Sequence, residues 1–323
     1  MKPKRVLVTG AGGFIGHHLV NYLVNQGHWV RAVDIKEPEF ANSVADEFEL
    51  LDLREFEHCR YVTLGIDHVY NLAADVGGVG YISKNFAGIA TNNSLINLHM
   101  LDASRRNDVS RFFFASSACV YPTSLQDSPD AEPLKEEDVL PADPDYAYGW
   151  EKLYMEKLCE YFHTDYGLET SVARFQNVYG PLDAYEGGRE KVIAATCRKV
   201  ALAQDGDEIE VWGDGTQSRS FIYIDDCVRG IYAIMQSRYE TPLNLGSNTA
   251  CTVSDLVDLI AKAANKTIGK RYDINKPQGV RGRLDDNTRV SFLTGWEPKT
   301  SLSEGIAETY RWVESQVGKG VLT

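Results

Sequence analysis

The chain contains no apolar run near the roughly 20 residues that a helix needs to cross a bilayer. Its start, Met1-Lys2-Pro3-Lys4-Arg5, leads into a short apolar segment and lacks the longer apolar region of a secretion signal. The chain has fewer basic than acidic residues, with 33 lysines and arginines against 46 aspartates and glutamates, so its formal net charge is −13. These features predict a cytoplasmic protein that binds no nucleic acid and no membrane surface.

The cysteines lack the spacing of a metal site. The chain has six cysteines, none of them in a C-x-x-C pair and none with the spacing of a zinc centre. We therefore predict that the protein holds no metal and that five of the thiols are buried or bystanders. The sixth, Cys119, stands two positions after Ser117 at the end of an apolar segment, beside other residues that carry chemistry.

Short apolar segments alternate with amphipathic stretches along most of the chain. This pattern is typical of a parallel sheet covered by helices on both faces, and the length of 323 residues suggests two modest domains. The expected strands are residues 5–9, 29–33, 48–51, 68–72, 111–116, 170–175 and 242–245. The sequence therefore predicts an α/β fold, a Rossmann-type doubly wound parallel sheet with a smaller, interleaved substrate domain.

The alternation breaks near residue 179, where a loop rich in glycine and charge begins. A helix at 192–203, a strand at 208–212 and helices at 224–236, 252–264 and 302–317 are expected after it. We assign residues 1–178, with 224–247 returning, to a first domain. Residues 179–223 and 248–323 are assigned to a second, smaller domain.

A glycine-rich turn follows the first expected strand and opens a helix. Glycines let backbone N–H groups approach a pyrophosphate at the positive end of that helix. Asp34 ends the second expected strand, where a carboxylate accepts the ribose hydroxyls and repels a 2′-phosphate, so NAD is predicted over NADP. The predicted cofactor-binding residues are Gly10, Gly12, Gly13, Phe14, Ile15, Gly16, Asp34, Asp52, Leu53, Ala73, Tyr148 and Lys152.

Tyr148 and Lys152 are four residues apart, so both side chains lie on one face of a helix. Tyrosine has a pKa near 10, and a neighbouring ammonium can stabilise the phenolate that a base needs at neutral pH. With Ser117 the pair is suited to reversible hydride transfer. With 17 tyrosines an isolated pair of this spacing is more often an exposed one, but the glycine turn and Asp34 favour catalysis.

These residues resemble the extended short-chain dehydrogenase/reductase family and, within it, the GDP-mannose 3,5-epimerases. The resemblance covers nearly the whole chain and is carried by residues 9–15, 71–75, 115–119, 147–149, 187–191, 212–215 and 279–283. It implies that Ser117, Tyr148 and Lys152 serve hydride transfer, and that Cys119 and Lys191 are the epimerising acid/base pair. It also implies a homodimer formed through the helices containing residues 93–106 and 148–162.

The resemblance further implies a nucleotide-diphosphate sugar as substrate, with a GDP-hexose favoured. It makes residues 1–178 with 224–247 the NAD-binding domain, and residues 179–223 with 248–323 the sugar-nucleotide-binding domain. The implied substrate-binding residues are Gly77, Ser117, Asn177, Glu190, Lys191, Lys199, Gln217, Arg281 and Arg283.

The chemistry explains why a thiol and an amine accompany a dehydrogenase set. Oxidation at C4 of a sugar acidifies the C–H bonds at C3 and C5, and inversion needs proton carriers on both ring faces. Lys191 would need burial or a cationic neighbour such as Arg189 to act near neutrality. A 4-epimerase, decarboxylase or dehydratase of the same family has no use for Cys119 and Lys191. A non-enzymatic NAD-sensing regulator has no use for Tyr148 and Lys152.

Overall fold

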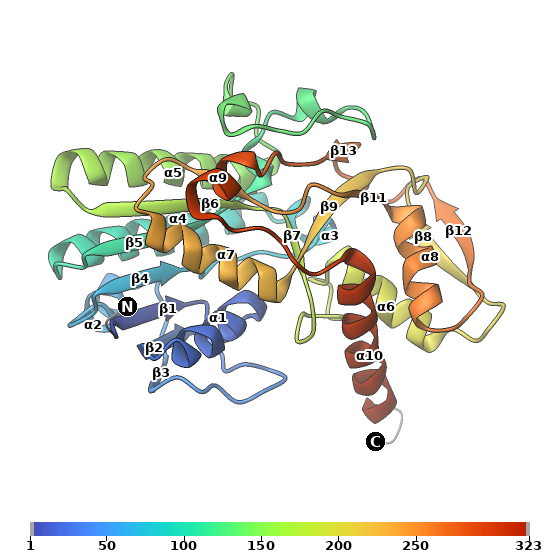
Figure 1. Ribbon diagram of the computed structural model, residues 1–323, viewed down its shortest axis with the longest axis horizontal. Helices are drawn as coiled ribbons and strands as arrows, with labels where there is room; N and C mark the ends of the chain where they lie inside the picture. Colours follow the sequence, from blue (N-terminus) through green and yellow to red (C-terminus); the bar gives the residue numbers. More distant parts are fainter. Residues whose placement is uncertain (1–2, 321–323) are drawn as a thin grey trace.

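The fold is built around a parallel β-sheet, as Figure 1 shows for the computed structural model, which describes residues 3–320. Within these residues the main sheet has seven strands in the order β10-β6-β5-β4-β1-β2-β3. They are β1 (Arg5–Thr9), β2 (Trp29–Asp34), β3 (Glu47–Leu50), β4 (His68–Asn71), β5 (Arg111–Ser117), β6 (Glu169–Phe175) and β10 (Leu243–Leu245). The order reverses between β1 and β4, where such sheets bind a dinucleotide. The predicted Rossmann-type fold is confirmed.

Helices cover both faces of the main sheet. They are α1 (Phe14–Asn25), α2 (Phe56–Val62), α4 (Phe86–Arg106), α5 (Tyr146–Tyr166) and α7 (Ile224–Ser237), and the short α3 (Val79–Ile82) contacts α5. Val6 and Val8 of β1 enter the buried cluster that includes side chains of α1 and α7, whereas Leu7 enters the cluster of α2, α4 and α5. Alternate residues of a strand point to opposite faces, which explains this division. Among residues 3–320 none of the helices has the length and apolarity of a membrane span.

The smaller part of the molecule lies beyond the carboxyl ends of the main strands (Figure 1). Its strands are β7 (Asn177–Tyr179), β8 (Glu208–Trp212), β9 (Ser218–Tyr223), β11 (Ala250–Thr252), β12 (Gly269–Asp273) and β13 (Gly282–Arg283). Central β9 pairs with β7, β11 and β13, and β8 pairs with β12. Helices α6 (Val192–Leu202), α8 (Val253–Ala263) and α10 (Leu302–Gly320) complete this part, whereas α9 (Thr288–Thr294) packs against α7 and β10. Short 3-10 turns are η1 (Ala118–Val120), η2 (Thr123–Gln126) and η3 (Glu136–Val139).

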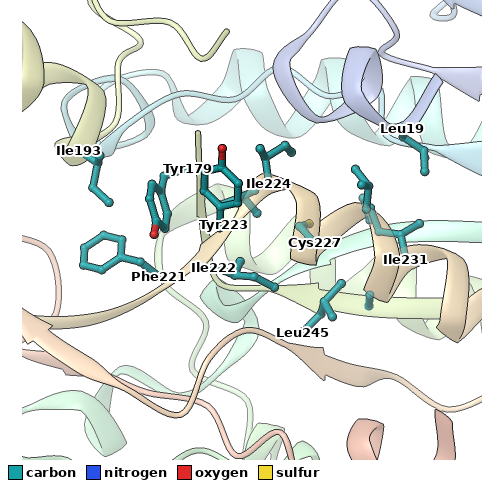
Figure 2. Close-up of a cluster of buried hydrophobic side chains, with 14 of the residues drawn as sticks. Leu19, Tyr179, Ile193, Phe221, Ile222, Tyr223, Ile224, Cys227, Ile231 and Leu245 are labelled. Carbon is teal, nitrogen blue, oxygen red and sulfur yellow. The ribbon is translucent and has the colours of Figure 1, made fainter. Parts of the chain in front are cut away.

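One buried cluster continues from the main sheet into the smaller part. Figure 2 shows Leu19 of α1 and Leu245 of β10 in the same cluster as Phe221 of β9 and Ile193 of α6. Strand β10 pairs with β6 in the main sheet, so the chain returns there after α7. The shared core holds the loops of the smaller part above the carboxyl ends of the main strands. The assignment of residue ranges to two domains stays a prediction.

Candidate active site

The glycine turn after β1 is too tight to admit side chains at its first position. Gly10 has φ +69°, and a Cβ on it would lie 2.8 Å from the backbone nitrogen of Ala73. Helix α1 follows, with Gly13 just before it and Phe14, Ile15 and Gly16 in its first turn. The N–H groups of this turn form the positive end of the helix. The turn and Ala73, both predicted to bind the cofactor, therefore meet at one edge of the sheet.

Asp34 ends β2 and lies against this turn. Its Oδ2 accepts a hydrogen bond from the backbone N–H of Gly12 at 2.9 Å, and its Oδ1 accepts one from Ile35 at 2.7 Å. Burial raises the pKa of Asp34, and the backbone hydrogen bonds oppose this rise. A pocket beside it is lined by Gly12, Gly13, Phe14, His17, Lys36, Pro38, Glu39, Phe40, Ala41, Leu182, Asp183 and Ala184. The arrangement fits the ribose and pyrophosphate of NAD.

Two other residues predicted at the cofactor have different partners in the structure. The carboxylate of Asp52 pairs with Arg54 at 2.6 Å, and hydrogen bonds from Arg54 lower the pKa of Asp52. The side chain of Leu53 is 3% exposed and packs into the cluster under α2 and α4. Contact of these residues with adenine stays a prediction.

The end of β5 and the start of α5 bring the predicted hydride-transfer residues together. The backbone N–H of Asp145, just before α5, donates to the carbonyl oxygen of Cys119 at 2.9 Å. Lys152 Nζ donates to the carbonyl oxygen of Ala115 at 2.9 Å and lies 5.6 Å from the ring centre of Tyr148. Both side chains of the predicted pair thus point from α5 towards the end of β5.

The electrostatics of Tyr148 differ from the sequence-based expectation. Burial raises the pKa of Tyr148, the nearby Cys119 and Glu151 add to the rise, and the Ser117 hydroxyl opposes it. Burial also lowers the pKa of Lys152. The net effect of its surroundings on the Tyr148 pKa is therefore a rise, whereas the sequence predicted a fall. Tyr148 is thus a neutral phenol at neutral pH, which is the form that donates a proton.

The thiol of Cys119 lies beside a buried guanidinium. Cys119 follows β5 in η1, and its backbone N–H donates to Ser117 Oγ at 3.1 Å. Arg283 Nη1 donates to Cys119 Sγ at 3.2 Å, and Arg283 Nη2 pairs with Asp145 at 3.2 Å. Arg283 Nε donates to Gln126 Oε1, which completes its partners. A predicted catalytic residue and a predicted substrate-binding residue therefore form one cluster.

Lys191 lies on a different element from Cys119. It stands at the N-terminus of α6, and its Nζ lies 5.7 Å from the ring centre of Phe14. Burial raises the pKa of the neighbouring Asp183, and the charge of Lys191 opposes that rise. Among residues 3–320 no hydrogen bond joins Lys191 to Cys119. The pairing of Lys191 with Cys119 across a sugar ring stays a prediction.

Four polar side chains predicted to hold the sugar nucleotide are fixed by the smaller part of the molecule. Asn177, Lys199 and Gln217 each donate to a backbone carbonyl oxygen at 2.8–3.0 Å. Arg281 pairs with Asp214 at 3.0 Å. These bonds orient the four side chains.

The remaining two predicted substrate residues, Gly77 and Glu190, lie on loops that touch each other. The backbone N–H of Gly78 donates to the carbonyl oxygen of Arg189 at 3.0 Å. The carboxylate of Glu190 accepts a hydrogen bond from the backbone N–H of Gly188 at 2.6 Å. The loop that contains Gly77 therefore borders the loop that carries Lys191.

Comparison with known proteins agrees with this geometry. Residues 6–246 match the NAD dependent epimerase/dehydratase family. The chain belongs to this family. The predicted family and the predicted NAD cofactor are thereby confirmed.

Three similar proteins show which members of this family the chain resembles. A GDP-mannose 3,5-epimerase of Arabidopsis thaliana is 43% identical over 317 residues, which are 98% of this chain and 83% of the relative. A UDP-glucose 4-epimerase of Thermotoga maritima, solved with UDP-glucose, has a TM-score of 0.86 at 26% identity, covering 97% of this chain and 99% of that one. A Thermus thermophilus UDP-glucose 4-epimerase complex with NAD has a TM-score of 0.83 at 25% identity, with coverages of 96% and 98%. The predicted resemblance to the 3,5-epimerases is confirmed.

Arg219 is a residue of this epimerase/dehydratase family member that sequence reasoning missed. It lies on β9, two positions after the predicted Gln217, and Arg219 Nη2 donates to the carbonyl oxygen of Val280 at 2.6 Å. Burial and the neighbouring guanidinium of Arg283 lower the pKa of Arg219 to about 10, and the charges of Asp145 and Cys119 oppose this fall. A second guanidinium thus stands near the thiol. Its nearness to Gln217 in the sequence was the available signal.

A buried carboxylate lies two residues beyond Arg283. Asp285 is fully buried, and among the described residues neither of its side-chain oxygens has a hydrogen-bond partner. The side-chain amide of Gln176 is likewise buried and unpartnered there, close enough to lower the Asp285 pKa but outside hydrogen-bond geometry. Burial raises the pKa of Asp285 to about 7, and the charge of Arg283 opposes the rise.

We expect Asp285→Asn to stabilise the protein more at pH 8 than at pH 5. The folded protein holds a proton on Asp285 up to about pH 7, whereas an unfolded chain releases it near pH 3.9, so stability falls as pH rises between these values. Asparagine has no such proton. Urea unfolding at both pH values should give the variant an advantage over wild type that is about 2 kcal/mol larger at pH 8. An equal difference at both pH values would contradict the assignment.

Proposed function

We propose that this protein is an NAD-dependent 3,5-epimerase acting on a nucleoside-diphosphate hexose, with GDP-mannose as the favoured substrate. The observation that carries the proposal is the thiol of Cys119, held by Arg283 at 3.2 Å within one turn of Ser117 at the end of β5. A plain C4 dehydrogenase or 4-epimerase needs no thiol at this place. The 43% identity to the Arabidopsis thaliana GDP-mannose 3,5-epimerase supports the same substrate.

The first step is oxidation at C4. NAD, when bound, supplies the acceptor for the C4 hydride and a positive charge that favours phenolate. Tyr148 accepts the proton of the C4 hydroxyl, and Ser117 orients that hydroxyl. Lys152 is buried against Ala115 and supports the negative charge on Tyr148. Because burial raises the Tyr148 pKa, this residue becomes a base only once positive charge joins it.

The second step is proton exchange beside the new ketone. A C4 carbonyl makes the protons at C3 and C5 removable, because the electron pair left on carbon spreads into an enolate. Cys119 and Lys191 approach from β5 and from the loop before α6, so one removes a proton and the other delivers one to the opposite face. The hydride then returns to C4 and Tyr148 gives back its proton, so the reaction has no net oxidation.

The cations near Cys119 suit an anionic substrate in an acidic protein. Arg281 and Arg283 stand on or beside β13, and Arg219 stands on the neighbouring β9. Guanidinium groups bind phosphate through paired N–H donors. We assign the diphosphate of the substrate to this region, with Asn177, Lys199 and Gln217 around the rest of it.

Deuterium incorporation tests the proposal. Purified protein should convert GDP-mannose in deuterated water and incorporate deuterium at C3, C5 or both, which nuclear magnetic resonance locates. Conversion without deuterium at either carbon would favour a 4-epimerase. Absence of any conversion of sugar nucleotides, despite bound NAD, would favour the non-enzymatic regulator.

The proposal includes a cytoplasmic homodimer. Helices α4 and α5 pack side by side and expose seven large apolar side chains, Phe86, Leu95, Leu98, Trp150, Tyr154, Tyr161 and Tyr166. Trp150, Tyr154 and Tyr161 of α5 recur at helical spacing, which gives one apolar face. A second copy of the chain would bury this face against its own equivalent. Light scattering should report the mass of two chains, and a monomer would contradict the assembly.

A further inference from the structure

We propose that Arg189 is a positioning residue, which clamps the loop carrying Lys191 to residues 75–83 and so sets the place of the Lys191 amine. The inference rests on the proposed function, in which Lys191 exchanges a proton with the sugar. This role is structural, whereas the sequence suggested that the positive charge of Arg189 helps Lys191 to act near neutral pH.

Residues 187–191, in the loop before α6, have one internal hydrogen bond, from the backbone N–H of Gly188 to the carboxylate of Glu190. Gly187 and Gly188 have φ values of +93° and +85°, and no atom lies within 4 Å of a Cβ built on either. Lys191 begins α6 without a side-chain cap. Glycines in open space leave a backbone many conformations, so the loop needs outside contacts to hold one.

Arg189 supplies several of those contacts, close to Lys191. Its Nη1 donates to Asp75 Oδ1 at 2.8 Å and to the carbonyl oxygen of Val76 at 3.1 Å, and its Nη2 donates to the Tyr81 hydroxyl at 2.7 Å. The guanidinium carbon also lies 4.0 Å from the centre of the Tyr81 ring. A planar cation with several donors can stack and bond at once, whereas a point charge cannot.

The backbones of the two loops are also in contact. The N–H of Gly78 donates to the carbonyl oxygen of Arg189 at 3.0 Å. A Cβ on Gly78 would lie 2.4 Å from the carbonyl oxygen of Glu190, so this approach requires glycine. Side-chain and backbone contacts therefore fix residues 189 and 190, which directly precede Lys191.

The residues that Arg189 contacts are themselves held by helix α4. Asp75 accepts from Asn92 at 3.0 Å, and its backbone N–H donates to Asn93 Oδ1 at 2.6 Å. Asn93 lies on α4 and also donates to Glu151 Oε2 at 3.4 Å, one residue before Lys152. The clamp thus ties the Lys191 loop to the network that supports the helix of Tyr148 and Lys152.

An electrostatic role for Arg189 is weakened by the same contacts. Hydrogen bonds from Asn92, Tyr81 and Arg189 overcome burial and lower the pKa of Asp75, so Asp75 is a carboxylate at neutral pH. This carboxylate lies 2.8 Å from Arg189 and offsets the positive charge that Lys191 would feel. Geometry, rather than charge, is what Arg189 contributes.

Arg189→Met in the NAD-loaded protein tests this inference, with GDP-mannose in deuterated water. We expect deuterium exchange at C3 and C5 to fall about 10- to 100-fold, because a displacement of about 1 Å at a reacting group has an effect of this size. The transient absorbance of reduced cofactor, which reports C4 oxidation, should stay near wild type. The pH profile of exchange should keep its position, and Arg189→Lys should restore only part of the rate.

Two further variants sharpen the test. Tyr81→Phe keeps the charge of Arg189 but removes one bond of the clamp, so exchange should fall by a smaller factor even where Arg189→Met is too unstable to assay. Arg60→Met is the matched control, because Arg60 pairs with Glu57 at 3.1 Å within α2 and takes no part in the contacts with residues 75–83 or in the loop before α6. It should exchange at the wild-type rate.

The outcomes separate this inference from the proposed function. Exchange within about twofold of wild type in both Arg189→Met and Tyr81→Phe would overturn the clamp, given the loss expected from misplacement. A shifted pH profile with full recovery in Arg189→Lys would overturn it in favour of a charge effect. If Lys191→Ala itself exchanges normally, the proposed function fails at Lys191, whatever Arg189 does.

Discussion

Tyr148→Phe should abolish turnover while leaving NAD bound. The variant keeps the ring in its buried site and removes only the hydroxyl that exchanges a proton with the C4 oxygen. Loss of one positioned acid/base group typically lowers the rate about 10²- to 10⁴-fold. Conversion of GDP-mannose, measured beside cofactor absorbance in the same sample, would show both effects.

Tyr154→Phe is the matched control, because Tyr154 lies on the same helix with its side chain 57% exposed. It should keep the wild-type rate. Denaturing wild type and Tyr148→Phe should release NAD in preference to NADP from both, since Asp34 repels a 2′-phosphate. A near wild-type rate in Tyr148→Phe would remove the oxidoreductive mechanism, and an extract rich in NADP would remove the role of Asp34.

The main sheet was predictable because its signals are local. Each of its seven strands was expected from an apolar run, and every observed end lies within one residue of the predicted one. The parallel sheet is buried on both faces, so its strands read as continuous apolar segments such as Phe112-Phe113-Phe114. The spacing of Tyr148 and Lys152 is equally local, since four residues on a helix share a face.

The strands of the smaller part were harder to predict because they depend on distant pairing. β9 joins β7, β11 and β13, which come from three separate stretches of chain, and β13 has only two residues. Segments this short carry no periodicity of their own. Of this part, the strand at 208–212 was predicted because Glu208–Trp212 alternates polar and apolar residues.

The contacts around the reacting groups could not be predicted from spacing either. Arg189 and Asp75 are 114 positions apart, and Arg283 and Cys119 are 164 apart. A sequence shows that such residues exist but not which charge neutralises which. The pKa of Tyr148 is the clearest example, because the spacing indicates the nearby ammonium but not the burial that outweighs it.

Cys119→Ala and Lys191→Ala should each separate oxidation from proton exchange. Neither residue belongs to the hydride-transfer group on β5 and α5, so reduction of NAD by the substrate should persist in both variants. Deuterium uptake at C3 and C5 should fall about 10²- to 10⁴-fold in each, because one of the two proton carriers is missing. A time course in deuterated water, with cofactor absorbance followed in parallel, measures both quantities.

Matched controls for these two variants come from residues outside the site. Cys251→Ala removes a buried thiol of β11, and Lys262→Ala removes an exposed amine of α8, so both should exchange normally. If deuterium uptake falls in only one of Cys119→Ala and Lys191→Ala, the other residue is not a proton carrier, and a different group must supply the second proton. A wild-type enzyme that turns over its substrate without deuterium at C3 or C5 would exclude the 3,5-epimerase, because inversion at either carbon requires its proton to leave and return from solvent-exchangeable groups.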